Sequence, residues 1–265
     1  MAKMMFYERP IPLNRERHQQ LKVAPVADHY RFASRTNAVP IISTEFGEAA
    51  RDYPIVFVGE ERGAFSVAAL VGLRDNENLM VDDAGRWAAG TYVPAFARRY
   101  PFVLAKTDGS EQLTVCVDEV HPGLGTEAGE ALFLQDGKAS PYLERVLEFL
   151  KAFHAEALRT AAFAGRLKEL GLLVPKVINV ERAGHARRSM RGLWVVDPVK
   201  FRGLDDVRVV ELFRSGYLGW IEAHLISLGS LARLVSRLDE HTAVSDETGV
   251  VVLGDADAAE PPVKH

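Results

Sequence analysis

The residues with the strongest potential for recognition chemistry lie between positions 87 and 100. Arg98 and Arg99 follow a short apolar stretch with helical character, and Trp87, Tyr92 and Tyr100 lie close to them in sequence. Two adjacent arginines cannot both face inward from a helix, so we expect one to pair with a carboxylate or a ligand and the other to be solvated. Cationic and aromatic groups gather both at recognition surfaces and at structural corners. Both interpretations stay open.

A second candidate, formed by His224 and Ser227, lies on the last predicted helix, about residues 217–238. The helical period places Trp220 and Leu231 on the same face, which should be buried, and a buried polar group without a partner costs about 1–3 kcal/mol. A hydrogen bond to a backbone carbonyl would make His224 structural, whereas a pocket in front of it would make it a ligand contact. The opposite face should be solvated and carries Glu222, Ser230, Arg233 and Arg237.

Asp118 is the third candidate, at the end of a predicted strand over 112–118. Alternation along a strand places Thr114, Cys116 and Asp118 on one face. A neighbouring carboxylate raises the pKa of a thiol, so Cys116 is predicted to be structural rather than a nucleophile. Asp118 remains a ligand-binding candidate.

Established catalytic signatures do not occur in the sequence: it has no P-loop, no H-E-x-x-H zinc helix and no G-x-S-x-G nucleophile elbow. The loop 123–129 resembles a dinucleotide-binding loop, but the carboxylates around it would repel a pyrophosphate. The one His-x-acid tripeptide, His154-Ala155-Glu156, falls in a predicted helix, where residues two apart point to different faces. We therefore predict no cofactor and no metal, and assign no catalytic residue.

The elements that must position these residues divide into two kinds along the chain. The front half is rich in β-branched and aromatic runs bounded by turn residues, which is typical of antiparallel strands and hairpins. After a polar N-terminal arm of about residues 1–40, with a strand near 21–24, a short helix is expected over 45–51. The predicted strands and hairpin cover 53–59, 65–73, 78–87, 101–105 and 112–118, the last two flanking a turn at 107–110.

From Ser140 the period changes to that of helices. Ser140 and Pro141 predict the start of a helix that ends at Gly171, with a break near Thr160 because thirty residues is long for a globular helix. A hairpin over 174–196 surrounds a basic loop, 182–190, and Asp197 and Asp205 or Asp206 are predicted to cap further helices. We expect an α+β fold, a β-rich front half covered by helices from the rear half, as a single domain over 1–238. An acidic tail, 239–265, is predicted to be disordered.

Composition narrows the function classes. A net charge of −4 gives no overall field that would attract nucleic acid, and no apolar run reaches the ~20 residues that a membrane span requires. The single cysteine fits a reducing compartment, and the first residues lack the apolar core of a secretory signal. We therefore expect a cytoplasmic protein that binds a protein partner or a small molecule. We expect neither nucleic-acid binding nor membrane insertion, and the sequence leaves open whether the chain forms a homo-oligomer.

Several short segments occur in a characteristic order along the chain. They are Tyr53-Pro54-Ile55-Val56-Phe57, Asn78-Leu79-Met80-Val81-Asp82, Gly85-Arg86-Trp87, residues 92–102, Cys116-Val117-Asp118, Leu132-Phe133, Asp136-Gly137, residues 192–197 and residues 223–228. In this order they resemble the SapC family of bacterial proteins, over roughly residues 10–235. The family is named after a locus for surface-layer protein export. Its members tend to be encoded beside TonB-dependent receptors and beside flavin-dependent halogenase-like or cupin-like proteins.

The resemblance implies an accessory or binding protein of a surface-layer or outer-membrane uptake or export system. It carries over no catalytic residues, so Trp87, Tyr92, Arg98, Arg99, Tyr100, Asp118, His224 and Ser227 are ligand-binding candidates on chemical grounds alone. The alternative is a metal-dependent oxygenase-like enzyme acting with the neighbouring proteins, with iron held by His154, His224 and a carboxylate.

Overall fold

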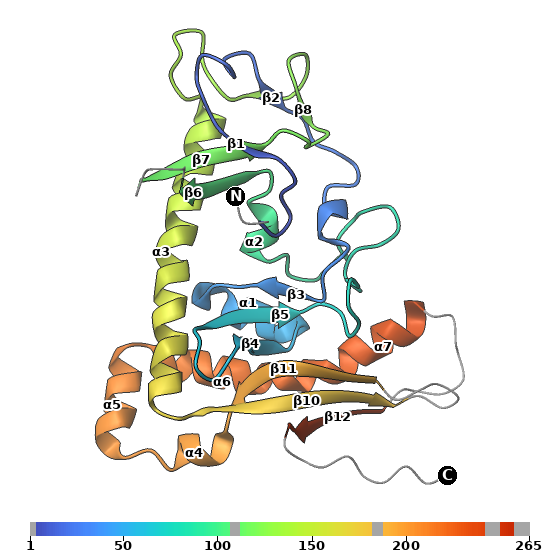
Figure 1. The fold of residues 1–265 in the computed structure, drawn as a ribbon. Coiled ribbons are helices and arrows are strands. Elements are labelled where there is room, and N and C mark those ends of the chain that lie inside the picture. Colours follow the sequence, from blue (N-terminus) through green and yellow to red (C-terminus); the bar gives the residue numbers. More distant parts are fainter. Residues whose placement is uncertain (1–3, 107–111, 182–187, 242–249, 257–265) are drawn as a thin grey trace. The chain divides into compact units, whose positions relative to one another are not determined.

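A computed structural model describes residues 4–106, 112–181, 188–241 and 250–256 (Figure 1). The chain is of the α+β class, as the sequence predicts, with antiparallel sheets and several helices. Its contacts divide it into two compact units. Unit 1 comprises Met1–Ser34 and Val81–Leu158, and unit 2 comprises Arg35–Met80 and Arg159–His265.

Unit 1 contains two small antiparallel sheets. One has the strand order β1-β7-β6, so the predicted pair of strands on either side of residues 107–111 is confirmed, although that turn lies outside the described residues. The other sheet has the order β8-β2-β9 and includes the strand expected near residues 21–24. The strands are β1 (Pro10–Pro12), β2 (Lys22–Val23), β6 (Phe102–Lys106), β7 (Leu113–Asp118), β8 (Leu124–Gly125) and β9 (Glu130–Ala131).

The helices of unit 1 are the 3-10 turn η1 (Arg31–Ala33), the short α2 (Ala95–Arg98) and the first part of α3 (Pro141–Glu169). The hydroxyl of Ser140 accepts a hydrogen bond from the N–H of Leu143 at 3.1 Å, which confirms the predicted cap. Leu143 and Leu150 of α3 pack into a core with residues of β6, β7 and the segment after β9.

The predicted break near Thr160 is wrong, because α3 is continuous to Glu169 and ends before Gly171, whose φ is +65°. Thr160 is tolerated within the helix because its hydroxyl accepts a hydrogen bond from the N–H of Ser43 at 2.8 Å.

Unit 2 is built on one six-stranded antiparallel sheet with the order β12-β10-β11-β4-β5-β3, which Figure 1 shows. Strands from the front and the rear of the sequence meet where β4 pairs with β11. The predicted strands and the hairpin of the rear half are thus present. The bounds are β3 (Ala38–Pro40), β4 (Ile55–Gly59), β5 (Phe65–Leu70), β10 (Leu173–Glu181), β11 (Arg188–Val196) and β12 (Val250–Asp255).

Helices of unit 2 pack on this sheet and on one another; in particular α6 contacts β4, β11 and α1. Asp197 and Asp205 cap α4 and α5 through their side chains, as predicted. The apolar interior includes the fully buried rings of Phe46, Phe57 and Phe163. The helices are η2 (Ser43–Glu45), α1 (Phe46–Asp52), α4 (Pro198–Arg202), α5 (Asp206–Arg214), α6 (Tyr217–Ser227), η3 (Leu228–Ser230) and α7 (Leu231–His241).

Besides the unbroken α3, two further segments differ from the sequence-based expectation. Part of the tail predicted to be disordered forms β12, because its run of β-branched residues pairs with the edge strand β10; residues 242–249 and 257–265, like the loop 182–187, lie outside the described residues. The hairpin expected over 78–87 is reduced to a turn with one bridge between Val81 and Trp87.

Among the described residues, no helix has both the length and the apolar composition that a membrane span requires.

Candidate functional site

Arg98, at the end of α2 in unit 1, has an exposed side chain. Its Nε donates to the carbonyl of Val93 at 3.0 Å and its Nη2 to the hydroxyl of Tyr92 at 3.2 Å. The guanidinium carbon also lies 5.8 Å from the ring centre of Tyr92 and 5.5 Å from that of Phe149 on α3. Both distances are within the range of cation–π attraction. We call Arg98, Tyr92 and Phe149 the Arg98 surface: a charged donor group held over aromatic rings.

Arg99 has turned inward, so the two arginines face different environments, as predicted from their adjacency. Its guanidinium stacks on Phe96 at 3.9 Å and lies 5.0 Å from the ring of Phe153. It also hydrogen-bonds to the hydroxyl of Tyr7, which in turn donates to the carbonyl of Phe102 at 2.7 Å. Burial lowers the pKa of Arg99 and raises that of Tyr7. The partner of Arg99 is therefore an internal hydroxyl rather than a carboxylate.

Two aromatic candidates belong to the interior of unit 1. Trp87 is only 8% exposed, and its ring meets that of Tyr30 edge to face at 5.6 Å. Tyr100 is buried against Phe32, with ring centres 4.0 Å apart. Burial, followed by the nearby Asp118, raises the pKa of Tyr100, so its hydroxyl is protonated and donates to that carboxylate. Neither ring offers a face to an incoming ligand.

Asp118 is fully buried and its carboxylate anchors the N-terminal arm. Its two oxygens accept the backbone N–H groups of Glu8 at 3.0 Å and Arg9 at 2.8 Å, in addition to the hydroxyl of Tyr100. A buried carboxylate needs several donors of this kind. The buried position of Asp118 therefore has a structural explanation: its carboxylate attaches the segment that leads into β1.

His121, which sequence reasoning did not select, is 3% exposed and lies beside Tyr100, with ring centres 5.3 Å apart. Its Nδ1 accepts the N–H of Gly123 at 3.1 Å, so the proton resides on Nε2, which has no hydrogen-bond partner among the described residues. Burial is the main cause of its lowered pKa, followed by His29. The only sequence signal was its position between the end of β7 and a glycine-rich loop.

His224 and Ser227 are both fully buried and belong to unit 2, whereas the other candidates belong to unit 1. The N–H of Val196 donates to Nε2 of His224 at 3.0 Å, and Nδ1 lies 2.9 Å from the carbonyl of Ile55, to which it donates. Ser227 accepts the N–H of Ile55 at 2.9 Å and donates to the carbonyl of His224 at 2.6 Å. Of the two interpretations, the structural one is confirmed for the histidine.

These bonds bear on the iron site expected of an oxygenase-like enzyme. Both ring nitrogens of His224 are used by the backbone, so it could bind a metal only by giving up one of these bonds. Within residues 4–106, 112–181, 188–241 and 250–256 no three histidine, cysteine or acidic side chains converge in a way that could hold a metal ion.

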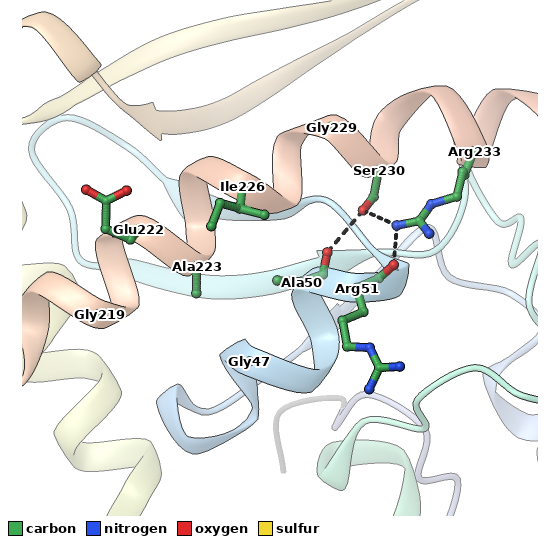
Figure 2. A pocket seen from close by; sticks show the side chains of 10 residues that line it. All are labelled: Gly47, Ala50, Arg51, Gly219, Glu222, Ala223, Ile226, Gly229, Ser230 and Arg233. Atoms are coloured by element: carbon green, nitrogen blue, oxygen red, sulfur yellow. Dashed lines mark hydrogen bonds between the residues drawn. The ribbon is translucent and has the colours of Figure 1, made fainter.

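A groove of about 810 Å³ lies on unit 2 between α1 and the helices α6 and α7 (Figure 2). Its lining combines small residues with exposed charges and one exposed isoleucine, Ile226. Ser230 and Arg233 close one end, because the serine donates to the carbonyl of Ala50 at 3.1 Å and the arginine donates to the serine at 2.9 Å and to the carbonyl of Arg51. The lining residues are Gly47, Ala50, Arg51, Gly219, Glu222, Ala223, Ile226, Gly229, Ser230 and Arg233.

Sequence reasoning missed this groove, although one signal was present: glycines at 219 and 229 leave gaps on the solvent face of the last helix. It also placed Ser230 on that solvent face, where the structure shows a buried side chain. The reason is the 3-10 turn η3, whose tighter winding rotates Ser230 toward α1.

The comparisons with known proteins are consistent with the order of segments noted above. No curated protein and no solved structure matches the chain. Among protein families, SapC matches residues 13–234, which includes every candidate residue described here. Because this match extends over most of the chain, the protein belongs to the SapC family.

Proposed function

We propose that this SapC-family protein is a cytoplasmic accessory binding protein of a surface-layer or outer-membrane, TonB-dependent uptake or export system, and that it contacts its partner through the Arg98 surface. Family membership supports the kind of system. The observation that carries the binding role is the exposed guanidinium of Arg98, held in place by two hydrogen bonds and two aromatic rings.

Such an arrangement favours binding for two physical reasons. A guanidinium already fixed over aromatic rings loses less conformational freedom when it meets a partner than a free side chain does. Arginine and tyrosine are also the residues that contribute most often to the energetic centre of an interface. The Arg98 surface therefore fits a carboxylate or another planar anionic group on a partner protein.

The test is a binding measurement with the proteins encoded beside the gene, each purified and titrated separately by calorimetry. Arg98→Ala is expected to weaken binding of one of them at least tenfold, which corresponds to about 1.4 kcal/mol. Arg98→Lys should weaken it as well, because an ammonium group cannot make both of the existing hydrogen bonds in the plane of a guanidinium.

Arg145→Ala is the matched control, since this arginine is exposed on α3 in the same unit and its loss changes the net charge equally. It should leave the affinity within about twofold. Thermal unfolding confirms that each variant is folded. Equal binding by Arg98→Ala and the wild type to every neighbouring protein would contradict the proposal.

A further inference from the structure

The outer face of the last helices carries a continuous exposed stripe. Its residues follow one another at spacings of three and four, which places them on one face of the helices. Ile226, at the middle of this stripe, is 71% exposed. We call these residues the α6–α7 stripe: Gly219, Glu222, Ile226, Gly229, Arg233 and Ser236.

The stripe borders the groove described above, and α1 forms the facing wall (Figure 2). A Cβ atom added at Gly47, Gly219 or Gly229 would meet no atom within 4 Å, so the space above each glycine is open. Glycine at such positions allows the backbones of two helices to approach closely and leaves a hole for a large side chain. Ile226 lies next to the hole at Gly229 along the stripe but cannot fill it, because both belong to the same helix face.

The order of residues along the stripe is complementary to itself when reversed. If a second stripe runs antiparallel about a two-fold axis midway between positions 226 and 229, Ile226 faces Gly229 of the other copy. The same register places Glu222 opposite Arg233 and Gly219 opposite Ser236. A large side chain meets a hole, opposite charges meet, and small residues meet.

We propose that two copies of this chain pair along the α6–α7 stripe in this antiparallel register. A two-fold interface requires a patch that is complementary to itself, which this sequence of sizes and charges provides. Glu222 forms no ion pair with any described residue of its own chain, so its carboxylate is available to a partner. Arg233 is already oriented by its bonds to Ser230 and to the carbonyl of Arg51.

This pairing is independent of the proposed binding function, because the Arg98 surface belongs to unit 1 and the stripe to unit 2. In this register the interface holds the two Ile226 side chains, one from each copy, and two ion pairs between Glu222 of one copy and Arg233 of the other, one at each end. We therefore expect a reversible dimer, present at high micromolar concentration and dissociating on dilution.

Sedimentation velocity over a micromolar to millimolar series measures the association directly. The wild type should show a concentration-dependent dimer. Gly229→Leu should weaken association at least tenfold, because the new side chain fills the hole that receives Ile226 of the other copy. Folding should be unaffected, since the position is open within one chain and leucine favours helix more than glycine does.

Ala232→Leu is the matched control, because it introduces the same side chain at an exposed position of the neighbouring helix α7, outside the stripe. It should leave the association constant unchanged. A wild type that stays monomeric throughout the series, or a Gly229→Leu variant that dimerises as the wild type does, overturns the proposal.

The register is tested by charge exchange. Glu222→Arg alone places two arginines opposite each other and should abolish the dimer, and the double variant Glu222→Arg with Arg233→Glu should restore it. Glu222→Arg leaves the bonds of Arg233 to Ser230 and to Arg51 in place, so loss of the dimer in this variant reports the charge contact. A folded double variant that fails to dimerise contradicts this register.

Discussion

At the scale of single residues, the side chain of His224 replaces a backbone hydrogen bond between two strands. Strands β4 and β11 pair at Leu193–Val58 and Trp194–Phe57, and in the same register Val196 would face Ile55. The imidazole is inserted at this point and connects the N–H of one strand with the carbonyl of the other. A neutral ring with its proton on Nδ1 satisfies both groups, whereas a protonated ring would place a donor against the N–H of Val196.

This geometry predicts a pH dependence of stability. Burial, opposed by the bond to Ile55, lowers the pKa of His224 from 6.5 to about 4. Below pH 6.5 the unfolded chain binds a proton on this ring that the folded protein does not bind until about pH 4. The free energy of unfolding should therefore fall as the pH is lowered through this window, by up to about 3 kcal/mol.

Two measurements check the protonation state of His224 and its contribution to stability. Imidazole nitrogen shifts of His224 should report the neutral Nδ1–H tautomer down to pH values near 4; a ring that titrates near its ordinary pKa contradicts the argument. Urea unfolding of His224→Gln should lose this component of the pH dependence and keep the part that comes from His18, His29 and His121, whose pKa values are also lowered by burial.

At the scale of elements, Asp118 shows how one buried carboxylate holds a short strand. Strand β1 pairs with β7 over three residues, and the preceding N–H groups of Glu8 and Arg9 bond to Asp118. In Asp118→Asn an NH2 group must face one of these N–H donors, which leaves a buried donor unpaired at a cost of about 1–3 kcal/mol. The arm should therefore detach more often.

Limited trypsin digestion measures this detachment, because Arg15 follows β1 on an exposed segment. Asp118→Asn should be cleaved at Arg15 roughly tenfold faster than the wild type, in line with the loss of about 1.4 kcal/mol of local stability. Asp136→Asn, an exposed position in the same unit, serves as the control and should match the wild type. Unchanged cleavage in Asp118→Asn contradicts the anchoring role.

Most elements could be predicted from sequence because their signals are local. The caps at Ser140, Asp197 and Asp205 and the strand runs around β4 and β10 depend on neighbouring residues alone. Elements that depend on tertiary pairing were predicted less well: β12 exists through its partner β10, and η3 rotates Ser230 toward the carbonyl of Ala50. Spacing along the chain does not encode such partners.

For the candidate site residues, too, the sequence lacks information about tertiary partners. The sequence singled out the polar and aromatic residues that need partners but could not say whether a ligand or the fold supplies them. For Asp118 and His224 the partners are backbone groups far away in sequence, from residues 8, 9, 55 and 196. Of the eight candidate residues only Arg98 is exposed, beside the half-buried Tyr92. The groove beside α6 depends on the path of α1, which no motif indicates.

At the scale of the whole molecule, the sequence predicts a single domain over 1–238, while the contacts divide the chain into two compact units. The chain passes between the units after Ser34, after Met80 and within α3 after Leu158. Unit 1 has a core of its own, in which Leu132 is fully buried and packs with Phe102 and Val117. Whether the units unfold together is a measurable property.

Leu132→Ala tests this cooperativity. Loss of a fully buried leucine costs about 2–5 kcal/mol, and the core that loses it consists of unit 1 residues. Amide hydrogen exchange should therefore accelerate in β6 and β7, while amides of β4 and β10 in unit 2 keep their wild-type protection, because separately packed cores open as separate cooperative units. Leu113→Ala, at an exposed position of β7, should change exchange in neither unit beyond its own neighbourhood. Equal acceleration of both sets of amides would instead mean that the chain behaves as one cooperative domain.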